Sequence, residues 1–130
     1  MSAHSPTLGL ALIVALAGGA GATLRALVIH HVGLRRPDPL PLGTMLVNAS
    51  GSLLLGILTG LSLYHGLGTH LLAVIGTGLC GGYTTWSTAS WETIHLLYTS
   101  HRTTAVLYTL GGLGVCLACA AVGIALTAWL

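Results

Sequence analysis

From Leu8 to about Val32 the chain is apolar apart from one charged residue, Arg25. A run of that length exceeds the apolar region of a signal peptide and is long enough for a helix to cross the hydrocarbon of a bilayer, which takes about 20 residues. We therefore predict a retained membrane-spanning helix here. A guanidinium within a span is costly, so Arg25 either extends toward the helix end or lies at the entrance of an anion path.

The charge content of the whole chain supports the same class. The 130 residues include four Arg, no Lys and two carboxylates, Asp38 and Glu92, so 5% are charged, against about a quarter in a soluble domain. The net charge of +2 is too small and too dispersed for a nucleic-acid surface. We expect an all-α membrane protein in a lipid bilayer, without a nucleic-acid partner.

Hydropathy and turn residues divide the chain into four transmembrane helices within a single domain, residues 1–130. The predicted helices are residues 8–31, 42–64, 70–99 and 103–130. The third is predicted to break near residues 80–84. A solvated linker joins the first two helices because its prolines, Pro37, Pro39 and Pro41, exclude a helix.

The predicted break lies in the stretch from Gly76 to Glu92. Its first half holds four weak helix formers, which are Gly76, Gly78, Gly81 and Gly82. Hydroxyl side chains then crowd the stretch, namely Thr84, Thr85, Ser87, Thr88 and Ser90. In lipid, a break survives only where it is buried in protein or lines a polar path. This stretch is therefore the candidate site.

Polar side chains elsewhere in the spans are few. Thr44, Asn48 and Ser52 share one face of the second helix. The hydroxyls could bond back to their own helix, whereas the Asn48 amide needs a partner, either across helices or in a ligand. Tyr108 lies near the start of the fourth helix, where an interfacial aromatic is the alternative to a polar-path residue.

These groups do not suggest catalysis. No nucleophile, base and orienting group fall together, metal-ligand spacings are absent, and Glu92 is the only carboxylate in a span, so an enzyme is not expected. The shared property of the hydroxyls, the Asn48 amide and the Trp86 indole N–H is that they donate hydrogen bonds without carrying charge. A small dehydrated anion needs such donors, and carbonyls freed at a break could hold a cation.

Three segments together resemble one known family. They are Gly18-Gly19-x-Gly21-Ala22-x-x-Arg25, Gly43-Thr44-x-x-Val47-Asn48-x-x-Gly51-Ser52 and Gly78-x-Cys80-Gly81-Gly82-x-Thr84-Thr85-x-Ser87-Thr88. In order and spacing they are similar to the Fluc (CrcB-type) fluoride channels, over nearly the whole chain.

The resemblance implies passive fluoride export through the cell (inner) membrane by an antiparallel, inverted dimer with two pores. It implies a central structural sodium ion, Na+, held by the backbone carbonyls of Gly81 and Thr84 from each subunit. It places Asn48 in the pore, Thr44 and Tyr108 beside it and Arg25 near the aqueous vestibule. The full set implied for the fluoride path is Arg25, Thr44, Asn48, Thr85, Trp86, Ser87, Thr88, Ala89 and Tyr108.

Two departures from the family pattern stand out. The family usually carries two phenylalanines in its third segment, but this chain has no Phe, and the matching positions are Trp86 and Ala89. We hypothesise that Trp86 takes over the anion contact. The family's line of hydroxyls below the tyrosine reads Gly112 and Cys116 here, and Thr109 is one residue off that line.

The arginines also bear on the partner. Arg25, Arg35, Arg36 and Arg102 all belong to the side of the membrane opposite the termini, which favours termini outside. Such a bias argues against equal insertion in both directions. A heterodimer with an oppositely oriented paralogue is therefore an alternative to the homodimer that the resemblance favours.

Two other functions compete with a fluoride channel. A four-helix small multidrug or cation exporter needs a carboxylate in the first helix, and this helix has none. A non-transporting membrane assembly protein would leave Asn48 and the hydroxyl run without a role.

Overall fold

The computed structural model describes residues 7–35 and 40–130, and within these ranges it is all-helical. The elements are α1 (Leu8–Arg35), α2 (Leu42–His65), α3 (Thr69–Leu71), the π-helix η1 (Leu72–Cys80), α4 (Gly81–Tyr83), α5 (Ser87–Tyr98) and α6 (Arg102–Ala128). Most of the predicted proline-rich linker, with Arg36, Pro37, Asp38 and Pro39, lies outside the described residues, as do residues 1–6 of the chain.

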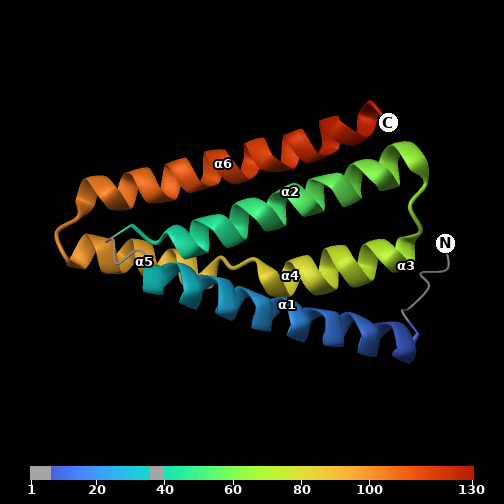
Figure 1. The fold of residues 1–130 in the computed structure, drawn as a ribbon, viewed down its shortest axis with the longest axis horizontal. Helices are drawn as coiled ribbons and strands as arrows, with labels where there is room; N and C mark the ends of the chain where they lie inside the picture. The colour runs from blue at the N-terminus through green and yellow to red at the C-terminus, as the bar shows by residue number, and fades with distance from the viewer. Residues whose placement is uncertain (1–6, 36–39) are drawn as a thin grey trace.

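Among the described residues, three helices, α1, α2 and α6, are long and apolar enough to cross a membrane. The chain is a membrane protein. A fourth rod is assembled from α3, η1, α4 and α5, which follow one another along one line between α1 and α2 (Figure 1). The start of α1, the α2–α3 connection and the end of α6 lie at one end of the molecule, and the α5–α6 connection lies at the other.

The helices of the fourth rod contradict the expected cause and position of its break. The first part of the rod stays helical through Gly76, Gly78, Gly81 and Gly82, and the helix ends only at Tyr83. The non-helical residues are 84–86 rather than 80–84, and Thr84 is extended, with φ −77° and ψ 159°. Weak helix propensity is readily overridden by packing, and two of these glycines, Gly78 and Gly82, lie in close contact with α1.

Glycines bring α1 against the fourth rod at backbone contact. A Cβ on Gly82 would collide with the carbonyl oxygen of Gly18, and one on Gly21 with that of Leu79. In the same way Gly56 and Gly123 bring α2 against α6. Small residues at helix crossings are how membrane helices gain close van der Waals contact.

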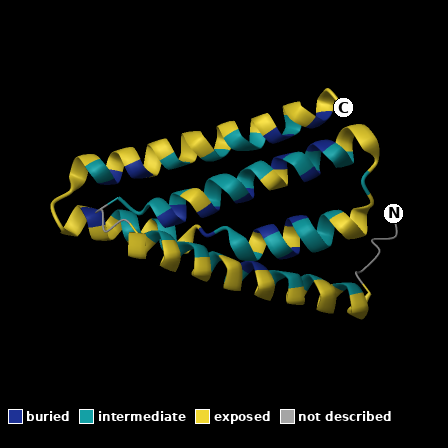
Figure 2. Cartoon of the chain, in the orientation of Figure 1, coloured by how far each residue is buried: buried dark blue, intermediate teal, exposed yellow. Residues whose placement is uncertain are grey.

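The two outer helices leave most of their apolar surface uncovered. Figure 2 shows α1 and α6 largely exposed, while α2 runs between its neighbours with many buried residues. Leu12, Leu16, Leu110 and Leu113 are among the exposed side chains. In a soluble protein such faces would be a liability, whereas in a membrane they can meet lipid or another helix.

Candidate functional site

Asn48 of α2 holds the non-helical residues in place through two hydrogen bonds to one residue. Its Nδ2 donates to the carbonyl oxygen of Thr85 at 2.9 Å, and its Oδ1 accepts the backbone N–H of Thr85 at 2.7 Å. In a continuous helix that N–H would donate to the carbonyl of Gly81, four residues earlier. The Asn48 side chain therefore takes the place of a helical bond and deprives the Gly81 carbonyl of its usual donor.

Thr85 extends this arrangement with its own hydroxyl. Thr85 is 7% exposed, and its Oγ1 accepts the backbone N–H of Thr88 at 3.2 Å in the first turn of α5. It also donates to Thr88 Oγ1 at 3.0 Å and lies 3.3 Å from Ser87 Oγ. A side-chain oxygen that satisfies a first-turn N–H is the usual way to begin a helix. Because Thr88 N–H is taken, the Thr84 carbonyl also lacks its helical donor.

Arg25 reaches this freed carbonyl from α1. Its Nη1 donates to the Thr84 oxygen at 3.0 Å, across 59 positions of sequence. The sequence left open whether Arg25 extends toward the helix end or lies at the entrance of an anion path. In the structure its side chain does not extend toward the helix end but contacts the interruption. A partly buried guanidinium is more tolerable in a span when it bonds to backbone carbonyls.

The hydrogen bonds around residues 84–86 form the first polar cluster, which comprises Arg25, Asn48, Thr84, Thr85, Ser87 and Thr88. Glu92 of α5 is the centre of a second polar cluster, one helical turn along α2. The hydroxyl of Thr44 donates to Glu92 Oε1 at 2.8 Å, and the hydroxyl of Tyr108 on α6 donates to Oε2 at 2.6 Å. Thr44 is 1% and Tyr108 4% exposed. Sequence reasoning assigned Glu92 no role in the path, although its position as the only carboxylate in a span was a usable signal.

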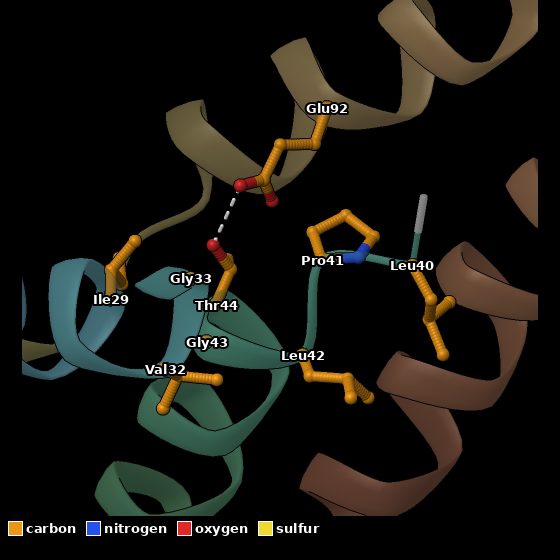
Figure 3. A pocket seen from close by; sticks show the side chains of 9 residues that line it. All are labelled: Ile29, Val32, Gly33, Leu40, Pro41, Leu42, Gly43, Thr44 and Glu92. Atoms are coloured by element: carbon orange, nitrogen blue, oxygen red, sulfur yellow. Dashed lines mark hydrogen bonds between the residues drawn. The ribbon is translucent and has the colours of Figure 1, made fainter. Parts of the chain in front are cut away.

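The second cluster opens into a pocket of about 150 Å³. Figure 3 shows Glu92 pointing toward Thr44 across it, with apolar side chains of α1 and the start of α2 around them. The lining residues are Ile29, Val32, Gly33, Leu40, Pro41, Leu42, Gly43, Thr44 and Glu92. A mostly apolar pocket with a few convergent polar groups is the usual form of a binding site.

The remaining predicted residues lie apart from these bonds. The Trp86 side chain is 78% exposed, and Ala89 packs beside the buried cluster of Leu96, Ala105 and Tyr108. The line expected on the fourth helix has no hydroxyl of its own. Thr109 instead lies 3.0 Å, oxygen to oxygen, from Thr93 of α5.

Within the described part of the chain, no group of three or more His, Cys, Asp or Glu could hold a metal ion. Backbone carbonyls can also bind a cation, and those of Gly81 and Thr84 are among the carbonyls of residues 81–85 that have lost their helical donors. A Cβ built on Gly81 meets no atom within 4 Å, so that side of the rod is open in the single chain. Freed carbonyls at a helix interruption are the usual ligands for Na⁺ in membrane proteins.

The chain is similar to a known family and to several of its members. The family model described as "CrcB-like protein, Camphor Resistance (CrcB)" matches residues 12–124. A protein of Cutibacterium acnes named fluoride-specific ion channel FluC 2 is 46% identical over 99 residues, covering 75% of this chain and 80% of that one. Fluoride-specific ion channel FluC 1 of Leifsonia xyli subsp. xyli is 42% identical over 113 residues, 87% of this chain and 82% of its own.

A third relative covers still more of both sequences. Fluoride-specific ion channel FluC 2 of Rhodococcus jostii is 40% identical over 116 residues, which are 89% of this chain and 96% of that protein. The match with the family model spans both polar clusters, from Arg25 in α1 to Tyr108 in α6. The chain belongs to the CrcB-like protein family.

Proposed function

We propose that this protein is a passive, fluoride-selective ion channel that exports fluoride from the cytoplasm across the cell membrane. The proposal is supported by the names of its relatives, which are fluoride-specific ion channels. The observation that carries it within this chain is the set of neutral donors around residues 84–86. Export then needs no chemical step, because the membrane potential supplies about 2.3 kcal/mol per charge per 100 mV.

The donors suit a small anion that must lose its water. An amide nitrogen has two hydrogens, and Asn48 uses one of them on the Thr85 carbonyl. The second remains for a ligand. The Thr85 hydroxyl lies within 3.3 Å of the hydroxyls of Ser87 and Thr88, so these hydrogens can be redirected. Fixed neutral donors can replace part of a hydration shell without trapping the ion as a full charge would.

Glu92 gives the second cluster a different role in the path. Its carboxylate already accepts the hydroxyls of Thr44 and Tyr108. A fluoride ion that enters from the pocket competes with the carboxylate for those two donors. The hydroxyls then pass from one acceptor to the other and are never left unpaired, which avoids the cost of a bare buried donor.

We further propose an antiparallel dimer with two fluoride pores and a central sodium ion. The open side of Gly81 and the exposed faces of α1 and α6 supply the surface that a second subunit would cover. Sodium, when bound, would fix the carbonyls of Gly81 and Thr84 from both subunits around one charge. A homodimer is favoured, and an oppositely oriented paralogue is the alternative. Expressing this chain alone and finding no antiparallel cross-link would reject the homodimer.

The test of the function is ion efflux from liposomes that contain the purified protein. A fluoride electrode should record rapid fluoride loss, and matched vesicles loaded with chloride should lose almost none. Equal rates for the two ions would contradict selectivity. Fluoride loss no faster than from protein-free vesicles would contradict a channel and would leave an exporter of other substrates or an assembly role.

A further inference from the structure

The Arg25 contact has a consequence for cation binding at the interruption. Arg25 is the one residue that reaches the Thr84 carbonyl from another helix, through the 3.0 Å bond to its Nη1. Within the part of the chain that the structure describes, no carboxylate forms an ion pair with Arg25. Among the described residues its positive charge thus has no carboxylate partner, and it lies beside a carbonyl that the proposed function assigns to sodium.

The carbonyl can serve both partners because its oxygen has two lone pairs. The bond to Arg25 occupies one of them, and the absence of a helical donor leaves the other for a cation. Two positive charges that share one oxygen repel each other, and the repulsion is strong where little water screens it. Gly81, the other carbonyl of the pair, has no such charged neighbour among its hydrogen-bond partners.

We propose that Arg25 is a positioning residue that holds the Thr84 carbonyl and, through its charge, lowers the affinity of the Gly81 and Thr84 carbonyls for sodium. This inference rests on the sodium site of the proposed function. The guanidinium of Arg25 thus takes over part of what a bound cation would do, because it bonds to the Thr84 carbonyl within one subunit. The interruption is thus shaped within one subunit before sodium arrives, and sodium binds less tightly than the carbonyls alone would allow.

The experiment measures sodium binding through stability rather than through transport. The full-length protein in detergent micelles is heated at a series of sodium chloride concentrations, with N-methylglucamine chloride keeping the ionic strength constant. A cation that binds only the folded protein raises the melting temperature once its concentration exceeds the dissociation constant. For Arg25→Gln the sodium concentration that gives half of this effect should fall about tenfold, because the charge is gone.

Two further variants make the test specific to charge. Arg25→Lys keeps the charge and should keep the half-effect concentration within about threefold of the unmodified protein. Arg35→Gln removes the same charge from the end of the same helix, away from the interruption, and should change nothing. If Arg25→Gln does not fold, Arg25→Lys still tests the inference. A tenfold fall in the half-effect sodium concentration of Arg25→Lys would rule out charge as the cause.

The inference is overturned if Arg25→Gln binds sodium with unchanged or lower affinity. It is also overturned if neither the unmodified protein nor Arg25→Gln responds to sodium. In that second case, selective fluoride efflux from liposomes would show that the channel function stands without this sodium site. If the protein showed neither stabilisation by sodium nor selective fluoride efflux, the proposed function itself would be contradicted.

Discussion

Asn48 and Thr44 lie one turn apart on α2, yet they belong to clusters of opposite character. Asn48 bonds to backbone atoms of Thr85, and the one charged side chain of its cluster, Arg25, bonds to the neighbouring carbonyl of Thr84. Thr44 bonds to the carboxylate of Glu92, which Tyr108 also contacts. The first cluster fixes the course of the main chain, and the second keeps movable donors on a charged acceptor. Two neighbouring turns of α2 therefore contribute to different tasks: one fixes the course of the backbone, and the other carries a hydroxyl that can change its acceptor.

The strongest way to break this comparison is to remove the Asn48 side chain. Asn48→Ala removes both bonds that hold Thr85 out of a continuous helix, and the loss of two hydrogen bonds costs about 0.5–1.5 kcal/mol for each. We expect fluoride efflux from liposomes to fall on the order of a hundredfold, since about 1.4 kcal/mol corresponds to a factor of ten. The matched control is Ser52→Ala, one turn further along the same helix face.

The contrary result is informative as well. If Asn48→Ala retained more than half of the efflux rate, the two bonds to Thr85 would not be what shapes the path. Asn48→Asp tests them separately, because an ionised carboxylate can accept the Thr85 N–H but cannot donate to its carbonyl. Its efflux should lie at or near that of Asn48→Ala.

A smaller effect is expected from Thr85→Val, which keeps the backbone bonds to Asn48 but removes the hydroxyl. The Thr88 N–H in the first turn of α5 loses its acceptor, and the loss of such a cap costs roughly 1 kcal/mol. Efflux should fall about tenfold and the melting temperature should drop. Efflux equal to that of the unmodified protein would limit the first cluster to Asn48 alone.

The second cluster should tolerate loss of a donor better than the first. In Tyr108→Phe the Glu92 carboxylate keeps its bond to Thr44 and faces the pocket, so water can replace the missing hydroxyl. We expect efflux about fivefold lower, with a stability cost of about 1–2 kcal/mol. If Tyr108→Phe lowered fluoride efflux as much as Asn48→Ala, the two clusters would not differ in how well they tolerate the loss of a donor.

Trp86 belongs to neither cluster, and its substitution tests whether a residue outside both of them contributes to the fluoride path. Its side chain is exposed in the single chain, so its anion contact would form only beside a second subunit. Trp86→Phe should keep a rate near that of the unmodified protein because it retains an aromatic edge, and Trp86→Ala should lose about threefold. An unchanged rate in Trp86→Ala would sink the hypothesis that this ring contacts fluoride.

The sequence identified the apolar helices because they are local patterns. It also singled out the stretch from Gly76 to Glu92, but with a break near residues 80–84 rather than at 84–86. It gave the wrong reason for the interruption, since the glycines before it are helical, and Gly78 and Gly82 pack against α1. The bonds that do accompany the interruption join Asn48 to Thr85, 37 positions away, and Arg25 to Thr84, 59 positions away. Contacts between helices depend on how the helices cross, and no local propensity encodes that.

The same limit explains why Glu92 was missed as a member of the site. Thr44 and Tyr108 were chosen by resemblance, and Glu92 was noted only as a lone carboxylate. The three meet because α2, α5 and α6 converge beside the pocket, with Glu92 48 positions from Thr44 and 16 from Tyr108. Only the folded arrangement shows that the two hydroxyls share one acceptor.

The central claim is that side-chain bonds from Asn48 create the non-helical backbone and free the carbonyls of Gly81 and Thr84. Solid-state NMR of the labelled protein in bilayers tests it directly, through the backbone carbon shifts of residues 84–86 in the unmodified chain and in Asn48→Leu. The account predicts extended shifts for Thr84 in the unmodified chain and helical shifts in the variant. Extended shifts of Thr84 that persist unchanged in Asn48→Leu would contradict it.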